Sequence, residues 1–158
     1  MGLRTPMYDM HLALGAKMID FSGWQLPLHY GSQVDEHHQV RNECGVFDVS
    51  HMCITDISGT DADAFLRYML SNDVARLQPG AGHYSAMLNA DGGVLDDLIV
   101  FRTPEGFRLI TNALTCTTSQ SWLAQHAEKF AVDIQLREDL AHFAIQGPDS
   151  IERLSQVL

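Results

Sequence analysis

Basic residues and long apolar runs are both scarce in this sequence. Its 158 residues include 10 Lys and Arg against 20 Asp and Glu, which gives a formal net charge of −10. That balance argues against broad nucleic-acid binding, which needs a basic surface. No stretch approaches the ~20 apolar residues that a membrane helix requires. We therefore expect neither nucleic acid nor a membrane among the partners.

Cysteine is also scarce, and recognisable targeting signals are missing. Cys44, Cys53 and Cys116 form an odd set without CxxC spacing, and we expect them to be reduced, cytosolic and mostly structural. Residues 1–11 lack the apolar core of a signal peptide and the Arg- and Ser-rich pattern of a transit peptide. These absences predict a cytoplasmic protein.

No pattern of metal ligands stands out. His37 and His38 are adjacent and would point in different directions on a helix, whereas a helical metal pair needs neighbours three or four residues apart. His126 has no second ligand four residues away on its helix. We therefore expect no metal ion.

The composition is that of a globular domain, with 46% hydrophobic and 19% charged residues. Residues 1–31 show no helical or strand period and predict an irregular arm rich in large apolar groups. Ser32 is placed to cap a helix over 32–43. Residues 141–146 predict a strand, and a short helix is expected after Asp149.

The middle of the chain predicts the order β-α-β-β-β-α-β. Strands are expected at 52–58, 83–89, 94–102, 107–112 and 132–136. Residues 60–63 resemble a capping box ahead of one helix, and Thr118 or Ser119 is expected to cap the other. Two helices crossing one face of an antiparallel sheet make an α+β fold close to the ferredoxin-like plan.

The stretch Met87–Phe101 predicts a hairpin that carries two adjacent carboxylates. Its Asp91-Gly92 predicts a hairpin with a type I′ turn, in which both central residues need positive φ. Because side chains alternate along the second strand, Asp96 and Asp97 face opposite sides of the sheet and cannot form a facing carboxylate pair. At least one carboxylate then lies among apolar neighbours, where it needs a partner or has a raised pKa.

Two interpretations of this strand stay open at this point. In the first, a carboxylate among apolar neighbours marks a functional site, because the apolar pattern of a strand does not otherwise include a charged group. Alternatively, the strand lies at a sheet edge and its solvated aspartates discourage pairing with another edge.

A second cluster of reactive residue types lies at Asp48, Ser50 and His51. These are the types found in a hydrolase triad, but the run lacks the GxSxG nucleophile elbow. For His51 the alternative is a structural histidine ahead of a strand, since no second catalytic group adjoins it.

Several motifs occur in a fixed order along the chain. They are RTPMY at 4–8, GAKMIDF at 15–21, GVFDVSHM at 45–52, Tyr84-Ser85, GGVLDDLIV at 92–100, Asn112 and QGP at 146–148. Together they resemble the N-terminal portion of the aminomethyltransferases, or T-proteins, of the glycine cleavage system. The resemblance covers essentially all of the sequence.

The resemblance implies a tetrahydrofolate-dependent transferase. Such an enzyme takes a methylene unit from the aminomethyl group on the lipoyl arm of H-protein, transfers it to tetrahydrofolate and releases ammonia. It implies tetrahydrofolate as co-substrate, lipoylated H-protein as partner and a folate cavity within a three-domain fold.

The resemblance also implies a set of site residues. Asp97, the second aspartate of the GGxxDDL motif, would be catalytic. Folate contacts would come from Met52, Tyr84, Asp97, Ile99, Phe101 and Asn112. The family often has Tyr where this chain has Phe101, which puts a polar contact there in question. Apolar walls with few placed polar groups suit a flat pterin ring.

Family members are about twice this length, as expected of a multidomain enzyme. Residues 1–51 and 140–158 then predict two parts of one split domain, with 52–139 as the domain between them, and a chain with little activity alone. Rival interpretations are a folate-binding relative acting in iron–sulfur cluster assembly or in sarcosine and dimethylglycine oxidation, and a non-catalytic interaction module.

Overall fold

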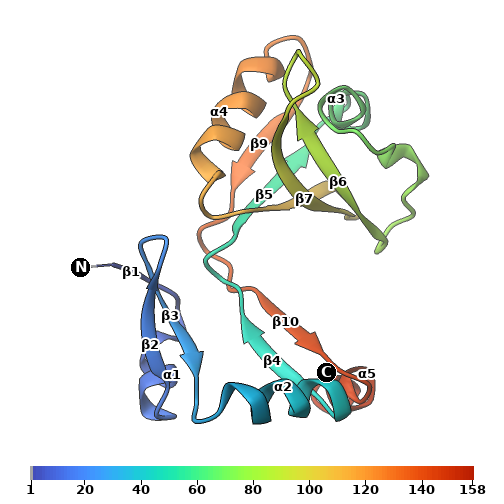
Figure 1. Cartoon of the computed structure of the whole chain (residues 1–158). Coiled ribbons are helices and arrows are strands. Elements are labelled where there is room, and N and C mark those ends of the chain that lie inside the picture. The colour runs from blue at the N-terminus through green and yellow to red at the C-terminus, as the bar shows by residue number, and fades with distance from the viewer. Residues whose placement is uncertain (1) are drawn as a thin grey trace. The chain divides into compact units, whose positions relative to one another are not determined.

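A computed structural model describes residues 2–158 (Figure 1). Its contacts divide the chain into two compact units. Unit 1 comprises the residues up to His51 together with Ala141–Leu158, and unit 2 comprises Met52–Leu140. Within the described residues, no helix has both the length and the hydropathy that crossing a bilayer would demand.

Unit 2 is a five-stranded antiparallel sheet with two helices. Its elements are β5 (Cys53–Ser58), α3 (Ala62–Met69), the short η1 (Val74–Arg76), β6 (Gly82–Leu88), β7 (Val94–Arg102), β8 (Gly106–Thr111), α4 (Cys116–Ala127) and β9 (Asp133–Leu136). The strand order is β6-β7-β8-β5-β9. The predicted α+β fold, with an antiparallel sheet and helices, is confirmed.

The core of unit 2 lies between one face of this sheet and the helices. Phe65 and Leu66 of α3 and Leu123 of α4 are fully buried against Val100 and Leu109 of the sheet. Alternate strand residues supply that face, so its composition follows from the period-2 pattern. Burying a large apolar side chain contributes about 1.5–3 kcal/mol, which makes this core the main source of stability in unit 2.

The hairpin between β6 and β7 is present, but its turn differs from the prediction. The N–H of Gly92 donates to the Asn89 carbonyl (3.0 Å), and within the 89–93 loop Gly92 alone has positive φ (81°). This is a type I turn followed by a left-handed glycine, which adds one residue to the loop. The type I′ turn predicted at Asp91-Gly92 was therefore wrong, and the Asn89 side chain stabilises the loop by accepting N–H groups from Asp91 and Gly93.

Two helix starts in unit 2 also differ from the prediction. The capping box at 60–63 is not formed: Asp61 precedes α3 without a capping hydrogen bond, and its carboxylate accepts the Ala131 N–H instead (2.8 Å). Helix α4 begins at Cys116, after Thr115, so Ser119 lies inside the helix and is fully buried. Tertiary partners for both side chains override the local capping signal.

Unit 1 contains two small sheets and three short helices among its described residues. Its elements are β1 (Leu3–Arg4), α1 (Tyr8–Ala13), β2 (Lys17–Phe21), β3 (Trp24–His29), α2 (Gln33–Asn42), β4 (Gly45–Asp48), β10 (Phe143–Gln146) and α5 (Ser150–Ser155). The sheets are β1-β3-β2 and β10-β4. In the second, Phe143 pairs with Asp48 and Gln146 with Gly45.

The irregular arm predicted for residues 1–31 was wrong. Ser22 and Gly23 have φ of 53° and 87°, so both central residues of the β2–β3 turn have the positive φ that a type I′ turn needs. The Gly23 N–H donates to the Asp20 carboxylate (3.1 Å), which supports that turn. By contrast, the cap predicted at Ser32 is confirmed, because its Oγ accepts the Asp35 N–H (3.2 Å).

The prediction of reduced cysteines was also wrong for two of the three. Cys53 at the start of β5 and Cys116 at the start of α4 form a disulfide across 63 residues, and Cys44 is free. Sequence spacing did not indicate the pair, since only the packing of α4 on the sheet brings the two residues together.

Candidate functional site

Strand β7 carries the two adjacent aspartates, and they face opposite sides of the sheet as predicted. Asp96 is 4% exposed on the face covered by the helices, whereas Asp97 is exposed on the other. Because β7 lies between β6 and β8, it is an interior strand. The alternative of solvated aspartates on an edge strand is therefore wrong.

A tyrosine and an asparagine hold the Asp97 side chain from the two neighbouring strands. The Tyr84 hydroxyl on β6 donates to Asp97 Oδ2 (2.6 Å), and Asn112 Nδ2, just beyond β8, donates to Asp97 Oδ1 (3.1 Å). The same Nδ2 also reaches the Asp97 carbonyl (3.0 Å). The carboxylate is thus held by one hydrogen bond on each oxygen and keeps lone pairs for a ligand.

Apolar side chains continue this surface along β7. Ile99 pairs with Tyr84 across the β6–β7 ladder and is 39% exposed, and Phe101 is 37% exposed one step further. We call the surface formed by Tyr84, Asp97, Ile99, Phe101 and Asn112 the Asp97 face. We call its polar members, Tyr84, Asp97 and Asn112, the polar corner. Polar groups beside exposed apolar side chains suit a flat amphipathic ligand.

Met52 lies at the margin of this group. It is half-buried and precedes Cys53, which pairs with Thr111, so it lies beside the strand end that carries Asn112. The structure therefore brings together five of the six predicted site residues on the Asp97 face and leaves Met52 adjacent to Asn112 along the β5–β8 ladder.

The Tyr84 hydroxyl is tuned by its partner. Its hydrogen bond to Asp97 raises the pKa of the phenol above its usual value, with the negative charges of Asp97 and Asp96 adding to that effect. Tyr84 therefore stays protonated at neutral pH and remains a donor to Asp97. At this position the hydroxyl orients the Asp97 carboxylate.

Ser119 extends the site into the buried side of the sheet through Asp96, a contact that the sequence pattern did not indicate. Ser119 Oγ donates to Asp96 Oδ2 (2.9 Å), and Asn112 Nδ2 donates to Asp96 Oδ1 (2.8 Å). A chain of hydrogen bonds thus crosses the sheet from α4 to the Asp97 face. A buried carboxylate needs such donors, but no local signal pointed to Ser119.

The hydrolase interpretation of Asp48, Ser50 and His51 fails on geometry. Asp48 pairs with His11 (Nε2 to Oδ2, 2.9 Å), and Ser50 Oγ donates to the His142 carbonyl (3.2 Å). His51 packs edge-on against Phe21 at 5.9 Å between ring centroids. Burial lowers its pKa, partly offset by the charge of Asp48. His51 thus packs against aromatic rings, and among the hydrogen bonds of the described residues none joins its ring to Ser50 or Asp48.

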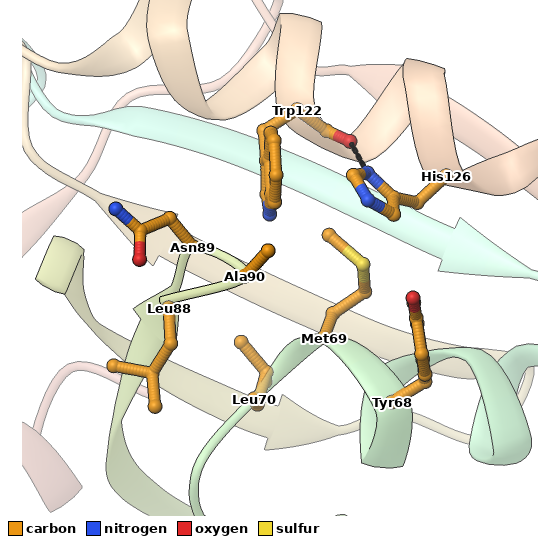
Figure 2. Close-up of a pocket in the computed structure, with 8 residues that line it drawn as sticks. All are labelled: Tyr68, Met69, Leu70, Leu88, Asn89, Ala90, Trp122 and His126. Carbon is orange, nitrogen blue, oxygen red and sulfur yellow. Dashed lines mark hydrogen bonds between the residues drawn. The ribbon is translucent and has the colours of Figure 1, made fainter. Parts of the chain in front are cut away.

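Two hollows in unit 2 lie away from these residues. One of about 280 Å³ lies between α3, α4 and the β6–β7 turn, where Figure 2 shows the Trp122 indole directed toward Met69. His126 also lines it, donating from Nδ1 to the Trp122 carbonyl (2.9 Å). Neither Asp97 nor Asn112 lines this hollow.

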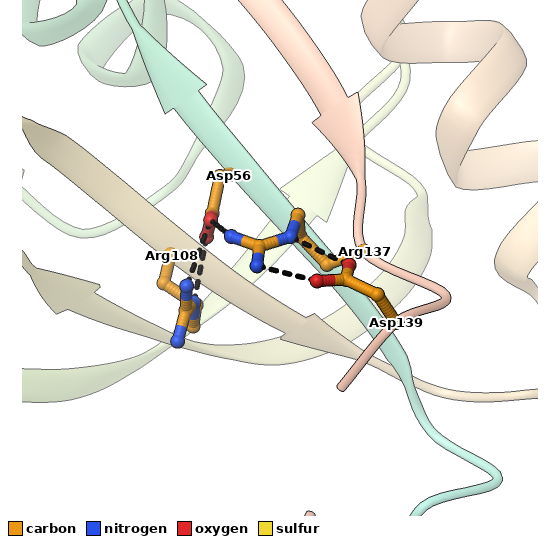
Figure 3. A network of polar contacts seen from close by, with 4 residues as sticks. All are labelled: Asp56, Arg108, Arg137 and Asp139. Carbon is orange, nitrogen blue, oxygen red and sulfur yellow. Dashed lines mark hydrogen bonds and ion pairs between the residues drawn. The ribbon is translucent and has the colours of Figure 1, made fainter. Parts of the chain in front are cut away.

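The second hollow, of about 240 Å³, borders an ion-pair network. Figure 3 shows Asp56 accepting from Arg108 and Arg137, and Arg137 binding Asp139. Arg108 and then Arg137 lower the pKa of Asp56, and Arg137 lowers that of Asp139 to about 2. Since each guanidinium already has a carboxylate, the network ties β5, β8 and the segment after β9 together.

Residues 7–158 match the family model described as the GCVT N-terminal domain. The chain belongs to this family. The resemblance drawn from the ordered motifs is therefore confirmed, and the GCVT N-terminal domain covers both units of the chain.

Two relatives place this GCVT domain within longer proteins. An aminomethyltransferase of Pseudomonas syringae pv. tomato is 53% identical over 159 residues, covering 100% of this chain and 44% of that protein. The crystal structure of glycine cleavage system aminomethyltransferase T from Bartonella henselae matches with 36% identity and a TM-score of 0.91, covering 97% of this chain and 43% of that one. The chain thus spans less than half the length of these relatives.

No cluster of metal ligands accompanies the site. Within residues 2–158, no group of three or more His, Cys, Asp or Glu side chains is arranged to hold an ion. The chemistry available at the Asp97 face is that of a carboxylate oriented by Tyr84 and Asn112: charge stabilisation, proton acceptance and recognition of N–H donors.

Proposed function

We propose that this chain is the part of a glycine-cleavage aminomethyltransferase that binds tetrahydrofolate on the Asp97 face. The complete enzyme would transfer a methylene unit from the aminomethyl-lipoyl arm of H-protein to tetrahydrofolate and release ammonia. The observation that carries this proposal is the position of Asp97, held between Tyr84 and Asn112 beside exposed Ile99 and Phe101. The names of the relatives support it.

Asp97 would serve the transfer by its charge. Loss of ammonia from the aminomethyl thioether leaves a sulfur-stabilised cationic carbon, which the folate N5 attacks. The carbon–sulfur bond then breaks, the dihydrolipoyl thiol leaves, and N10 closes the methylene bridge. A carboxylate with both oxygens already oriented can stabilise the developing positive charge without rearranging, and it can accept or relay the N5 proton. Asn112 would orient the pterin ring, with Met52, Tyr84, Ile99 and Phe101 contacting it.

The chain is shorter than its relatives, which bears on its activity and on its domain organisation. Since it spans 44% of the Pseudomonas relative, we propose that it has little transferase activity alone. We also propose that residues 1–51 and 140–158 are two parts of one split domain, with 52–139 as the other domain. A cytoplasmic location remains a prediction of the same kind.

Calorimetric titration of tetrahydrofolate under reducing, anaerobic conditions tests the binding proposal. Saturable binding is expected for the wild-type chain. Asp97→Asn should weaken it about tenfold or more, because a hydrogen bond to a charged group contributes about 1.5–3 kcal/mol. Asp91→Asn, an exposed carboxylate in the β6–β7 turn, is the matched control and should leave affinity unchanged.

Two results of the titration would contradict the binding proposal. Unchanged affinity in Asp97→Asn would remove Asp97 from the site. No binding by a folded wild-type chain would reject folate recognition by these residues. A pull-down with lipoylated and unlipoylated H-protein then separates the enzyme from a non-catalytic module, since only the former requires the lipoyl arm.

A further inference from the structure

The Asp96 carboxylate is buried without a cation. It is 4% exposed, and among the ion pairs of the described residues none includes it. Its two oxygens accept from neutral donors, Ser119 Oγ at 2.9 Å and Asn112 Nδ2 at 2.8 Å. A buried carboxylate keeps both donors in place, because losing either one would leave a carboxylate oxygen without a hydrogen bond.

These contacts determine which way the Asn112 amide points. Its nitrogen has two hydrogens and faces three acceptors: Asp96 Oδ1, the Asp97 carbonyl and Asp97 Oδ1, all within 3.1 Å. A carboxylate only accepts, so a flipped amide would place its oxygen against three other oxygens. The nitrogen is therefore held against the two aspartates, and Asn112 Oδ1 is left directed away from them.

We propose that Asp96 and Ser119 are positioning residues that hold the Asn112 amide so that its oxygen accepts an N–H of the ligand on the Asp97 face. The inference rests on the proposed function for the identity of that ligand, the pterin ring of tetrahydrofolate. That ring has N–H groups on its pyrimidine and pyrazine edges, so it can supply the donor.

The arrangement makes the polar corner of the Asp97 face a set of acceptors. Tyr84 has already donated its hydroxyl hydrogen to Asp97, and Asn112 has donated both of its amide hydrogens. What remains for a ligand is the Asn112 oxygen and the free lone pairs of Asp97. The site thus selects a ring edge that carries N–H donors over one that carries acceptors.

The first test needs no ligand. In wild type, both side-chain amide protons of Asn112 should exchange slowly with solvent in NMR spectra, because both are hydrogen-bonded. Asp96→Asn should accelerate that exchange about tenfold, since an amide at 96 no longer dictates the orientation of Asn112. Protection of the β7 and β8 backbone amides should be unchanged, which separates positioning from a general loss of structure.

The second test uses tetrahydrofolate as the probe in calorimetry. Asp96→Asn should weaken tetrahydrofolate binding about tenfold, because it removes the charged acceptor of the Asn112 amide. Ser119→Ala should weaken it about threefold, because it removes only the hydrogen bond that orients Asp96. Asp61→Asn controls for the lost charge, since Asp61 is another carboxylate of unit 2 that accepts a hydrogen bond, there from the Ala131 N–H. Ser85→Ala controls for the lost buried hydroxyl, since Ser85 is 3% exposed.

The two tests fail in different ways. If the wild-type chain binds no tetrahydrofolate but Asp96→Asn frees the Asn112 amide, the proposed function fails and the positioning role stands. If wild type binds and neither Asp96→Asn nor Ser119→Ala changes exchange or affinity, the positioning role is overturned. Should Asp96→Asn not fold, Ser119→Ala alone decides the matter by the same two measurements.

Discussion

The two units of the chain are built on different principles. Every buried apolar residue of the described chain except Leu26 lies in unit 2, where α3 and α4 cover one face of a single sheet. In unit 1, helices α2 and α5 bury no residue and α1 buries only His11. Helices of this length are marginal in water without packing.

The difference shows where a site can be held rigidly. In unit 2 the buried core fixes β7 between its neighbours, and the Asp97 face lies on the side opposite that core. Unit 1 depends more on turns, caps and polar contacts, such as the Arg153–Glu43 ion pair (2.9 Å). We therefore expect unit 1 to open at a lower free energy than unit 2.

The chain has one tryptophan in each unit, which makes the comparison measurable. Trp24 lies in unit 1 and Trp122 in unit 2. Single-tryptophan versions, made with Trp24→Phe or Trp122→Phe, report the urea unfolding of one unit each. The unit 2 midpoint should be the higher of the two, and equal midpoints with coincident transitions would contradict the comparison.

The largest effect is expected from the core of unit 2. Phe65 is fully buried, so Phe65→Ala should cost about 3–5 kcal/mol in the free energy of unfolding of unit 2. Phe47 in unit 1 is 45% exposed, and Phe47→Ala should cost less than about 1 kcal/mol. Urea titration of each variant, followed by the tryptophan of its unit, measures both; similar losses would remove the distinction between the units.

The next effect concerns the disulfide of unit 2. Reducing Cys53–Cys116 should destabilise unit 2 by about 2–4 kcal/mol, because the link limits the unfolded chain, and should leave unit 1 unchanged. Thiol labelling in denaturant without reductant should detect Cys44 alone. Three reactive thiols would show that the bond is not formed, and Cys44→Ser is the control that should alter neither unit.

A smaller effect is expected at the cap of α2 in unit 1. Ser32→Ala removes the acceptor of the Asp35 N–H and should cost about 1 kcal/mol in unit 1. Ser32→Asp retains a capping oxygen and should restore most of the loss. Hydrogen exchange of the first turn of α2 measures it, and equal protection in Ser32→Ala and wild type would rule out the cap.

The smallest effect is a difference in pH dependence. The pKa of His51 is lowered by burial, so the unfolded chain, with an ordinary value of about 6.5, binds the proton more readily and unit 1 loses stability as pH falls below that value. In unit 2 the pKa of Asp56 is lowered by Arg108 and Arg137, so its contribution is lost only below about pH 4.

Acidification from pH 7 to pH 5 should therefore lower the Trp24-reported midpoint and leave the Trp122-reported midpoint in place. His51→Phe, which keeps an aromatic ring beside Phe21, should abolish the shift in unit 1. A shift of the same size in both units would point to groups other than His51.

Local pattern was sufficient for some features of this protein and misleading for others. The alternation along β7 correctly separated Asp96 from Asp97, and Ser32 correctly marked the start of α2. The capping signal before α3 failed because Asp61 is used by Ala131, which is 70 residues away. Turn residues alone did not tell which dipeptide has positive φ at both positions, Asp91-Gly92 or Ser22-Gly23.

The amino-acid sequence alone determined the family, the α+β class and the sides of the sheet on which the aspartates lie. Both the order of the motifs and the alternation of side chains along a strand can be read without knowing the tertiary structure. Tertiary structure decided that β7 is an interior strand, that Asn112 and Ser119 meet Asp96, and that Cys53 meets Cys116. These contacts join residues 16 to 63 positions apart. Long-range pairing depends on how whole elements pack and has no local signature.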